Sequence, residues 1–133
     1  MKRKVLFVCW GNICRSVMAE YICKQMRPEI DCESRAVSND ATGCDIYPAA
    51  KRCLDRHGIA YQKHRARRVS QADYEAFDEI YVMDELNMRY IKRIIDDYDR
   101  KILMLCDDEI EDPWYTDRFD LVYDQILEGI RSL

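Results

Sequence analysis

The sequence lacks the features of a membrane protein and of a nucleic-acid-binding protein. No apolar run approaches the roughly 18 residues of a candidate membrane span. The basic start, Met1 to Lys4, precedes an apolar run that extends only from Val5 to Trp10, and no small-residue cleavage site follows, so we expect no signal peptide. Basic residues are not in excess either, since 21 Lys and Arg stand against 25 Asp and Glu, for a net charge of −4. We therefore expect neither a membrane nor a nucleic acid as a partner.

The sequence also lacks any Cys-x2-Cys pair, although it contains seven cysteines. This spacing argues against a zinc ribbon and a thioredoxin-like redox site. The count is odd and no secretory signal is expected, which favours a reduced, cytoplasmic protein in which most cysteines act as small apolar residues. We expect no metal and no cofactor. The cysteines without metal-ligand spacing are Cys23, Cys32, Cys44, Cys53 and Cys106.

What the sequence does contain is an alternation of strand and helix patterns across a single domain, residues 1–133. Strands are expected at 4–8, 30–37, 79–83 and 101–105, and helices at 17–26, 47–57, 70–77, 86–98 and from 119 onward. In the first helix we expect Glu20 on the polar side, and in the fourth we expect Leu86 and Tyr98 on the apolar face with Ile91. This order predicts an α/β fold, a doubly wound, flavodoxin-like domain with a four-stranded parallel sheet and helices on both faces.

In such a sheet, sites form outside the carboxyl ends of the strands. The residues that follow predicted strands, and should therefore share one rim, are Cys9, Ser38, Asp84 and Asp112.

The first of these rim segments is a Cys-x5-Arg loop, Cys9 to Arg15, between a buried strand and a helix. Backbone N–H groups from Trp10 to Ser16, opening onto a helix N-terminus, can bind the oxygens of a phosphate group. Gly11 permits close approach of the backbone, and Asn12 is suited to a left-handed conformation.

Two side chains complete the chemistry of this loop. Arg15 supplies a planar charged fork for two phosphate oxygens. The same positive field favours the thiolate form of Cys9, and the Ser16 hydroxyl can donate to that sulfur when it leaves. The loop therefore predicts a nucleophile at the base of an oxyanion site.

A phenol has a pKa of about 10 and leaves poorly as its anion, so an aryl phosphate needs a general acid. Asp112 is the best candidate, because Pro113 restricts it to an extended conformation that fixes the direction of its carboxylate. Trp114 and Tyr115 offer flat faces for an aromatic ring. We expect a bell-shaped pH–rate profile with an acidic optimum.

These residues resemble the low-molecular-weight protein tyrosine phosphatase family. The resemblance rests on Val8 to Ser16 followed by Met18-Ala19-Glu20, on Met83-Asp84 and on Asp112-Pro113, and it spans nearly the whole chain. It implies a phosphocysteine intermediate, with Cys9 as nucleophile, Arg15 as phosphate-binding residue and Asp112 as general acid. The implied substrate is a phosphotyrosine protein or a small aryl phosphate, and inorganic phosphate or a similar oxyanion would bind in the loop.

The resemblance also implies roles for the surrounding loop. Cys14 would form a reversible disulfide with Cys9 under peroxide. The residues that would bind phosphate or support the loop are Trp10, Gly11, Asn12, Ile13, Cys14, Ser16, Ser34 and His64.

Three positions and one loop depart from the family pattern. Val17 replaces a usual proline, Trp10 replaces an aliphatic residue of the pocket wall, and Trp114 replaces the first tyrosine after Asp-Pro. The loop from Ser38 to Gly43 lacks an aromatic residue that often walls the cleft. These departures bear on the shape of the substrate wall, formed by Trp10, Trp114 and Tyr115, and so on the choice of substrate.

Three alternatives remain open. Arsenate reductases share this fold and loop but relay a disulfide to two mid-chain cysteines, whereas no cysteine lies between Cys53 and Cys106 here. Arginine phosphatases of the family favour threonine where this chain has Ile13. A non-catalytic phosphopeptide-binding module would not need a nucleophile, an arginine and an acid together.

Overall fold

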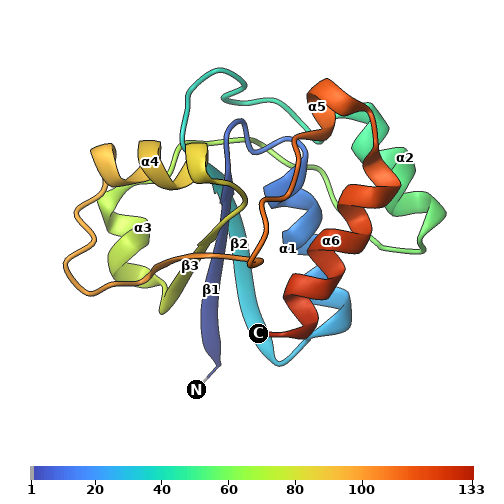
Figure 1. Cartoon of the computed structure of the whole chain (residues 1–133). Helices are drawn as coiled ribbons and strands as arrows, with labels where there is room; N and C mark the ends of the chain where they lie inside the picture. Colours follow the sequence, from blue (N-terminus) through green and yellow to red (C-terminus); the bar gives the residue numbers. More distant parts are fainter. Residues whose placement is uncertain (1) are drawn as a thin grey trace.

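Four parallel strands form the centre of the fold (Figure 1). The computed structural model describes residues 2–133. The strands are β1 (Arg3–Cys9), β2 (Ile30–Ala36), β3 (Glu79–Val82) and β4 (Ile102–Met104), in the order β2-β1-β3-β4. In the register Cys9 pairs with Ala36, and Val8 pairs with both Arg35 and Val82. The predicted parallel sheet is confirmed, and Cys9 ends one of its two central strands.

Helices cover both faces of this sheet, as predicted (Figure 1). One core contains α1 (Arg15–Met26), α2 (Pro48–Arg56) and α6 (Phe119–Arg131), and the other contains α3 (Gln71–Ala76) and α4 (Glu85–Ile94). Phe7 belongs to the first core, and Leu6 and Val8 belong to the second. This double coverage explains why β1 is an uninterrupted apolar run. Within residues 2–133, no helix has both the length and the apolar content needed to cross a bilayer.

The predicted boundaries hold best where local chemistry sets them. Pro48 occupies the first turn of α2, and Gly58 follows the helix with a φ of +69°, a left-handed conformation that favours glycine. Ser70 accepts a hydrogen bond from the backbone of Asp73, and the Asp73 side chain accepts one from the backbone of Ser70. This capping box begins α3.

The prediction for the fourth helix was wrong beyond residue 94. α4 ends at Ile94, so Tyr98 lies outside the helix. Tyr98 is 61% exposed, and its ring packs against that of Tyr74. Leu86, 47% exposed, lies on the outer side of α4. Ile91, predicted on the apolar face, is buried in the second core, as is Ile95 directly after the helix.

Two further differences concern the edges of the site. α1 begins at Arg15, two positions before the expected start at Val17. A short helix that was not predicted, α5 (Pro113–Thr116), lies within the acidic loop that follows β4. Asp112 is its N-cap residue.

Candidate active site

The Cys-x5-Arg loop connects the end of β1 directly to the start of α1. Cys9 is 3% exposed and ends the strand, while Arg15 is the first residue of the helix. Among the residues that the structure describes, no side chain caps the N-terminus of α1. The unpaired N–H groups of its first turn, together with the helix dipole, therefore favour an anion in this loop.

Asn12 organises the loop from behind. It is fully buried and has a φ of +60°, the left-handed conformation expected of it. Its side-chain amide donates to Ser16 Oγ at 2.8 Å and to Ser34 Oγ at 2.9 Å, and its backbone N–H donates to Cys9 Sγ at 3.3 Å. His64 Nε2 lies 2.7 Å from the Asn12 carbonyl oxygen; because a carbonyl only accepts, Nε2 carries the proton. Ser16, Ser34 and His64, three of the predicted loop-supporting residues, thus each contact Asn12.

Glu20 extends this network, and its predicted position was wrong. It was expected on the polar side of its helix, but it is 7% exposed, because that side of α1 packs against β2. Ser34 Oγ donates to one Glu20 oxygen at 2.6 Å and Lys24 Nζ to the other at 2.6 Å. These two partners satisfy the buried carboxylate. Ser16 Oγ in turn lies 3.1 Å from Cys9 Sγ, so hydrogen bonds connect the Glu20–Lys24 ion pair to the thiol.

Arg15 lies at the floor of the site, with a side chain only 2% exposed. Its Nη1 donates to Asp84 Oδ2 at 2.7 Å and to the Ile110 carbonyl at 2.9 Å. Burial opposes the charged guanidinium, but the negative charges of Cys9, Asp112 and Asp84 outweigh it and raise the pKa of Arg15. Sequence reasoning put Asp84 on this rim, from its position after a predicted strand, but did not pair it with Arg15.

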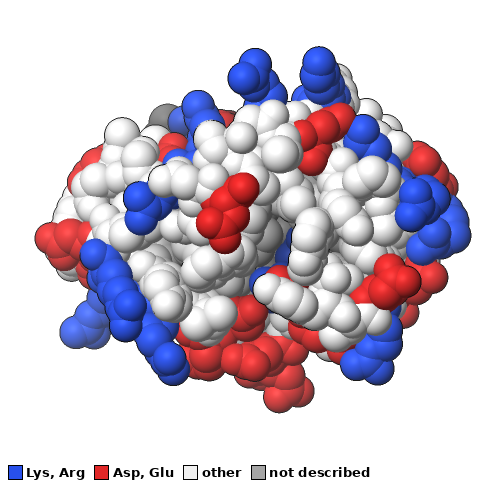
Figure 2. Space-filling model, turned by 90° about the horizontal axis from the view of Figure 1, so that it is seen from above, with Lys and Arg blue, Asp and Glu red and all other residues white. Residues whose placement is uncertain are grey.

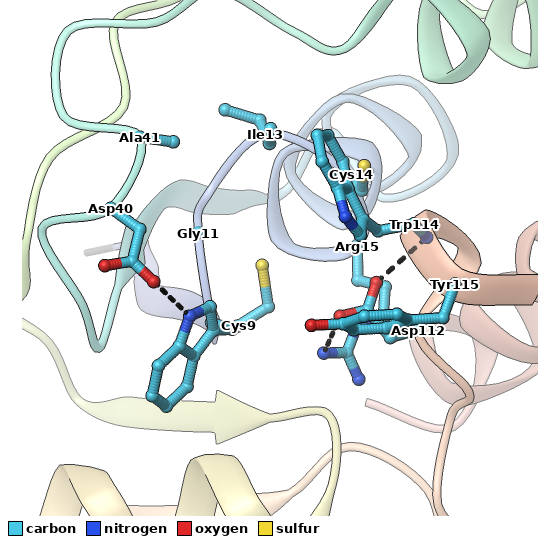
Figure 3. Close-up of a pocket in the computed structure, with 11 residues that line it drawn as sticks. Cys9, Gly11, Ile13, Cys14, Arg15, Asp40, Ala41, Asp112, Trp114 and Tyr115 are labelled. Atoms are coloured by element: carbon cyan, nitrogen blue, oxygen red, sulfur yellow. Dashed lines mark hydrogen bonds and ion pairs between the residues drawn. The ribbon is translucent and has the colours of Figure 1, made fainter.

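Asp112 reaches the same guanidinium from α5. Its Oδ2 lies 3.4 Å from Arg15 Nη2, and its Oδ1 accepts the Trp114 backbone N–H at 3.0 Å (Figure 3). The cap therefore holds the carboxylate in a fixed orientation toward Arg15, as the following Pro113 had suggested. Residues about a hundred positions apart in the sequence meet in one site.

A cavity of about 240 Å³ opens between the loop and α5. Trp10 lines this cavity next to Cys9 in the sequence. Trp114 and Tyr115, which are 53% and 84% exposed, line it from α5 (Figure 3). Sequence reasoning missed Asp40 and Ala41, which come from the loop after β2. The lining residues are Cys9, Trp10, Gly11, Ile13, Cys14, Arg15, Asp40, Ala41, Asp112, Trp114 and Tyr115.

Several predicted residues lie outside this lining. Asn12, Ser16, Ser34 and His64 support the loop from behind. Ser38 is on the expected rim, but its hydroxyl donates to the Trp10 carbonyl at 2.9 Å and braces the loop.

Cys14 lines the cavity and is free, as is Cys9. Burial, reinforced by the nearby charges of Cys9 and Asp112, raises the pKa of the Cys14 thiol. Of the two sulfurs that line the cavity, Cys14 is therefore held protonated and is a poor nucleophile at neutral pH.

Within residues 2–133, one group of side chains could hold a metal ion, and it lies away from the cavity. Cys53 from α2, His57 directly after that helix and Asp120 from α6 bring their ligand atoms within 4.8 Å of one another. The Arg56 guanidinium already donates to Asp120 Oδ1 at 3.0 Å, which balances the carboxylate charge. The group serves as a polar contact between the two helices.

Comparisons with known proteins agree with this geometry. The family model described as low molecular weight phosphotyrosine protein phosphatase matches residues 4–133. The phosphatase of that name from Gallus gallus is 36% identical over 147 residues, covering 98% of this chain and 92% of that protein. The low molecular weight protein-tyrosine-phosphatase YfkJ of Bacillus subtilis is 33% identical, with coverages of 97% and 92%. The crystal structure of the low molecular weight protein tyrosine phosphatase from Streptococcus pyogenes superposes with a TM-score of 0.91 at 32% identity, covering 98% of this chain and 89% of that one. The chain therefore belongs to the low molecular weight phosphotyrosine protein phosphatase family.

Proposed function

We propose that this protein hydrolyses phosphotyrosine and other aryl phosphate monoesters through a phosphocysteine intermediate. The observation that carries the proposal is the meeting of Cys9, Arg15 and Asp112 around one cavity of about 240 Å³. A nucleophile, a phosphate-binding cation and a carboxyl group are the three parts that this reaction requires.

In the first step the Cys9 thiolate attacks phosphorus, and the bond from phosphorus to the phenolic oxygen breaks. The N–H groups of the loop and the Arg15 guanidinium hold the three other oxygens as charge moves onto them. Asp112 gives its proton to the leaving phenolic oxygen, so the phenol departs neutral. Its hydrogen bond from the Trp114 backbone leaves Oδ2 on the Arg15 side of the cavity.

In the second step water attacks the phosphocysteine. Asp112, now ionised, takes a proton from that water, and the bond between phosphorus and sulfur breaks to release inorganic phosphate. The departing thiolate accepts the hydroxyl hydrogen bond of Ser16, whose oxygen lies 3.1 Å from Cys9 Sγ. Asn12 keeps that hydroxyl in position through its own hydrogen bond of 2.8 Å.

The aromatic walls favour an aryl substrate over an alkyl one. Trp10, Trp114 and Tyr115 line the cavity together with Cys9 and form a slot in which a phenyl ring can contact aromatic faces. A phosphoserine has no ring to fill this slot. Ile13, in the same lining, offers no hydroxyl to a phosphoarginine guanidinium.

We also propose that the enzyme works in the reducing environment of the cytoplasm. All seven cysteines are free, and the reaction needs Cys9 as a thiolate.

The test is turnover of phosphotyrosine, phosphoserine and phosphoarginine peptides by the wild-type protein and by Cys9→Ser. We expect hydrolysis of the phosphotyrosine peptide only, and none by Cys9→Ser. The matched control is Cys44→Ser, which removes an exposed thiol outside the cavity lining and should retain full activity. Activity that survives in Cys9→Ser would refute the mechanism, and faster release from phosphoarginine would refute the specificity.

A further inference from the structure

Asp40 is a carboxylate at the cavity that the proposed reaction does not use. It lies in the loop after β2, lines the cavity beside Ala41, and its side chain is exposed. Its Oδ2 accepts a hydrogen bond from the indole Nε1–H of Trp10 at 2.8 Å (Figure 3). Its backbone N–H donates to Ser38 Oγ at 3.3 Å, which fixes the loop at this point.

The hydrogen bond ties the carboxylate to the substrate wall. The Trp10 ring also contacts Tyr90, whose ring meets it edge-on with centroids 5.2 Å apart. Trp10 therefore cannot turn away without losing both contacts. One Asp40 oxygen serves this bond, and the other oxygen remains available to a ligand at the cavity mouth.

The charge around the mouth makes Asp40 a candidate for recognising a cation. Among the described residues that line the cavity, Arg15 is the only cation, and it is buried at the floor. Within residues 2–133, no Lys, Arg or His side chain forms an ion pair with Asp40, whereas Asp112 pairs with Arg15. The nearby Arg93 stacks on Tyr90, with its guanidinium carbon 4.9 Å from the ring centroid.

The same distribution is visible on the whole face. Figure 2 looks down on the carboxyl edge of the sheet, where acidic side chains surround a largely uncharged central hollow. Lys and Arg side chains lie mainly at the edges of this view, apart from a small basic area at the bottom of the hollow. A substrate thus meets positive charge at the phosphate position and negative charge at the rim.

We propose that Asp40, held by Trp10, selects phosphotyrosine segments that carry a lysine or arginine next to the phosphotyrosine. This proposal rests on the proposed function and adds a substrate class to it. An acidic neighbour would face the unpaired carboxylate and be repelled, while a basic neighbour would form a solvent-exposed ion pair with it.

The experiment compares kcat/KM for phosphotyrosine peptides that differ only in one flanking residue, Lys, Gln or Glu, at each position within two residues on either side. At the most sensitive position we expect a preference for Lys over Glu of about fivefold, which corresponds to about 1 kcal/mol. The preference should fall toward one at high salt, because screening at roughly 1 M leaves a Debye length of about 3 Å.

Two variants separate the charge of Asp40 from its contact with Trp10. Asp40→Asn keeps an oxygen acceptor for the indole but removes the charge, so the Lys-to-Glu ratio should fall to about one. Asp40→Ala removes both, so the same loss of preference should be joined by a higher KM for an uncharged aryl phosphate. The matched control is Asp31→Asn, an exposed carboxylate on β2 outside the cavity lining, which should keep the wild-type ratio.

The measured quantity is the Lys-to-Glu ratio of kcat/KM within each protein. A general loss of activity in a variant lowers both values and leaves this ratio unchanged. An unchanged Lys-to-Glu ratio in Asp40→Asn would overturn the proposal, as would an equal change in Asp31→Asn. Failure of the proposed function looks different, since no phosphotyrosine peptide would then release phosphate. In that case the dissociation constants of the same peptides are measured with the Cys9→Ser protein. Their Lys-to-Glu ratio must still be abolished when Asp40→Asn is added to that protein.

Discussion

Replacement of Asp112 by asparagine tests the link between the loop on β1 and the acid on α5. Asparagine keeps the side-chain oxygen that caps α5, because Asp112 Oδ1 accepts from the Trp114 backbone N–H at 3.0 Å. Both residues are good helix N-caps, so the fold should be preserved. The variant loses the proton that can be given to the leaving group, and it loses the negative charge that lies 3.4 Å from Arg15 Nη2.

The expected loss of rate in Asp112→Asn follows from the basicity of the leaving oxygen. General acids contribute roughly 10²- to 10⁴-fold to a rate, which is about 3–5 kcal/mol of barrier. Phenyl phosphate and phosphotyrosine, whose phenols have a pKa near 10, should lose that full amount. An ester of a much more acidic phenol, such as p-nitrophenol, needs less help and should lose less.

The assay is kcat for a series of aryl phosphates with wild type and Asp112→Asn. The loss in the variant should grow as the leaving phenol becomes less acidic. Asp112→Ala removes the capping oxygen as well as the acid. It should therefore also lower the unfolding free energy by about 1 kcal/mol. An equal loss for all leaving groups, or no loss for phenyl phosphate, would refute the assignment of the acid.

Three stability predictions follow from contacts outside the reacting centre. Gly129→Ala would put a Cβ 2.7 Å from Leu105 Cγ, so urea denaturation should show a loss of about 1–3 kcal/mol, and an unchanged midpoint would contradict the packing. Ser34→Ala removes a buried hydroxyl with partners on two sides, and should cost about 1–3 kcal/mol by the same measurement and slow turnover through the loop. Asp45 has its pKa lowered to about 2 by the hydrogen bond from Lys51 and by backbone N–H groups. Because the folded pKa lies below the unfolded one, its stabilisation is present above pH 4 or so and is lost as the pH falls toward about 2. Asp45→Asn should flatten that part of the stability curve, whereas a slope equal to that of the wild type would contradict the contact.

The sequence by itself determined the parts of this protein that depend on neighbouring residues. The apolar run of β1, the capping box of α3 and the glycine after α2 act within a few positions, so their pattern is sufficient. The same holds for the loop from Cys9 to Arg15, whose thiol, arginine and helix start lie within one segment. The predicted end of α4 was wrong for the opposite reason. Tyr98 packs against Tyr74 on α3, and no pattern of neighbouring residues indicates that contact.

The tertiary structure decided what each of these segments meets. Burial of Glu20 depends on β2 packing against α1, and the ion pair of Arg15 with Asp84 and Asp112 depends on three segments converging at one rim. The contact between Trp10 and Asp40 is of the same kind, because it joins loops from two neighbouring strands. Across such separations, spacing in the sequence does not indicate which residues lie close together in space. The order of the strands in the sheet does, because it sets which of the following loops are neighbours. The reacting groups were therefore readable in the sequence, while the surroundings that charge and shape them exist only in the folded chain.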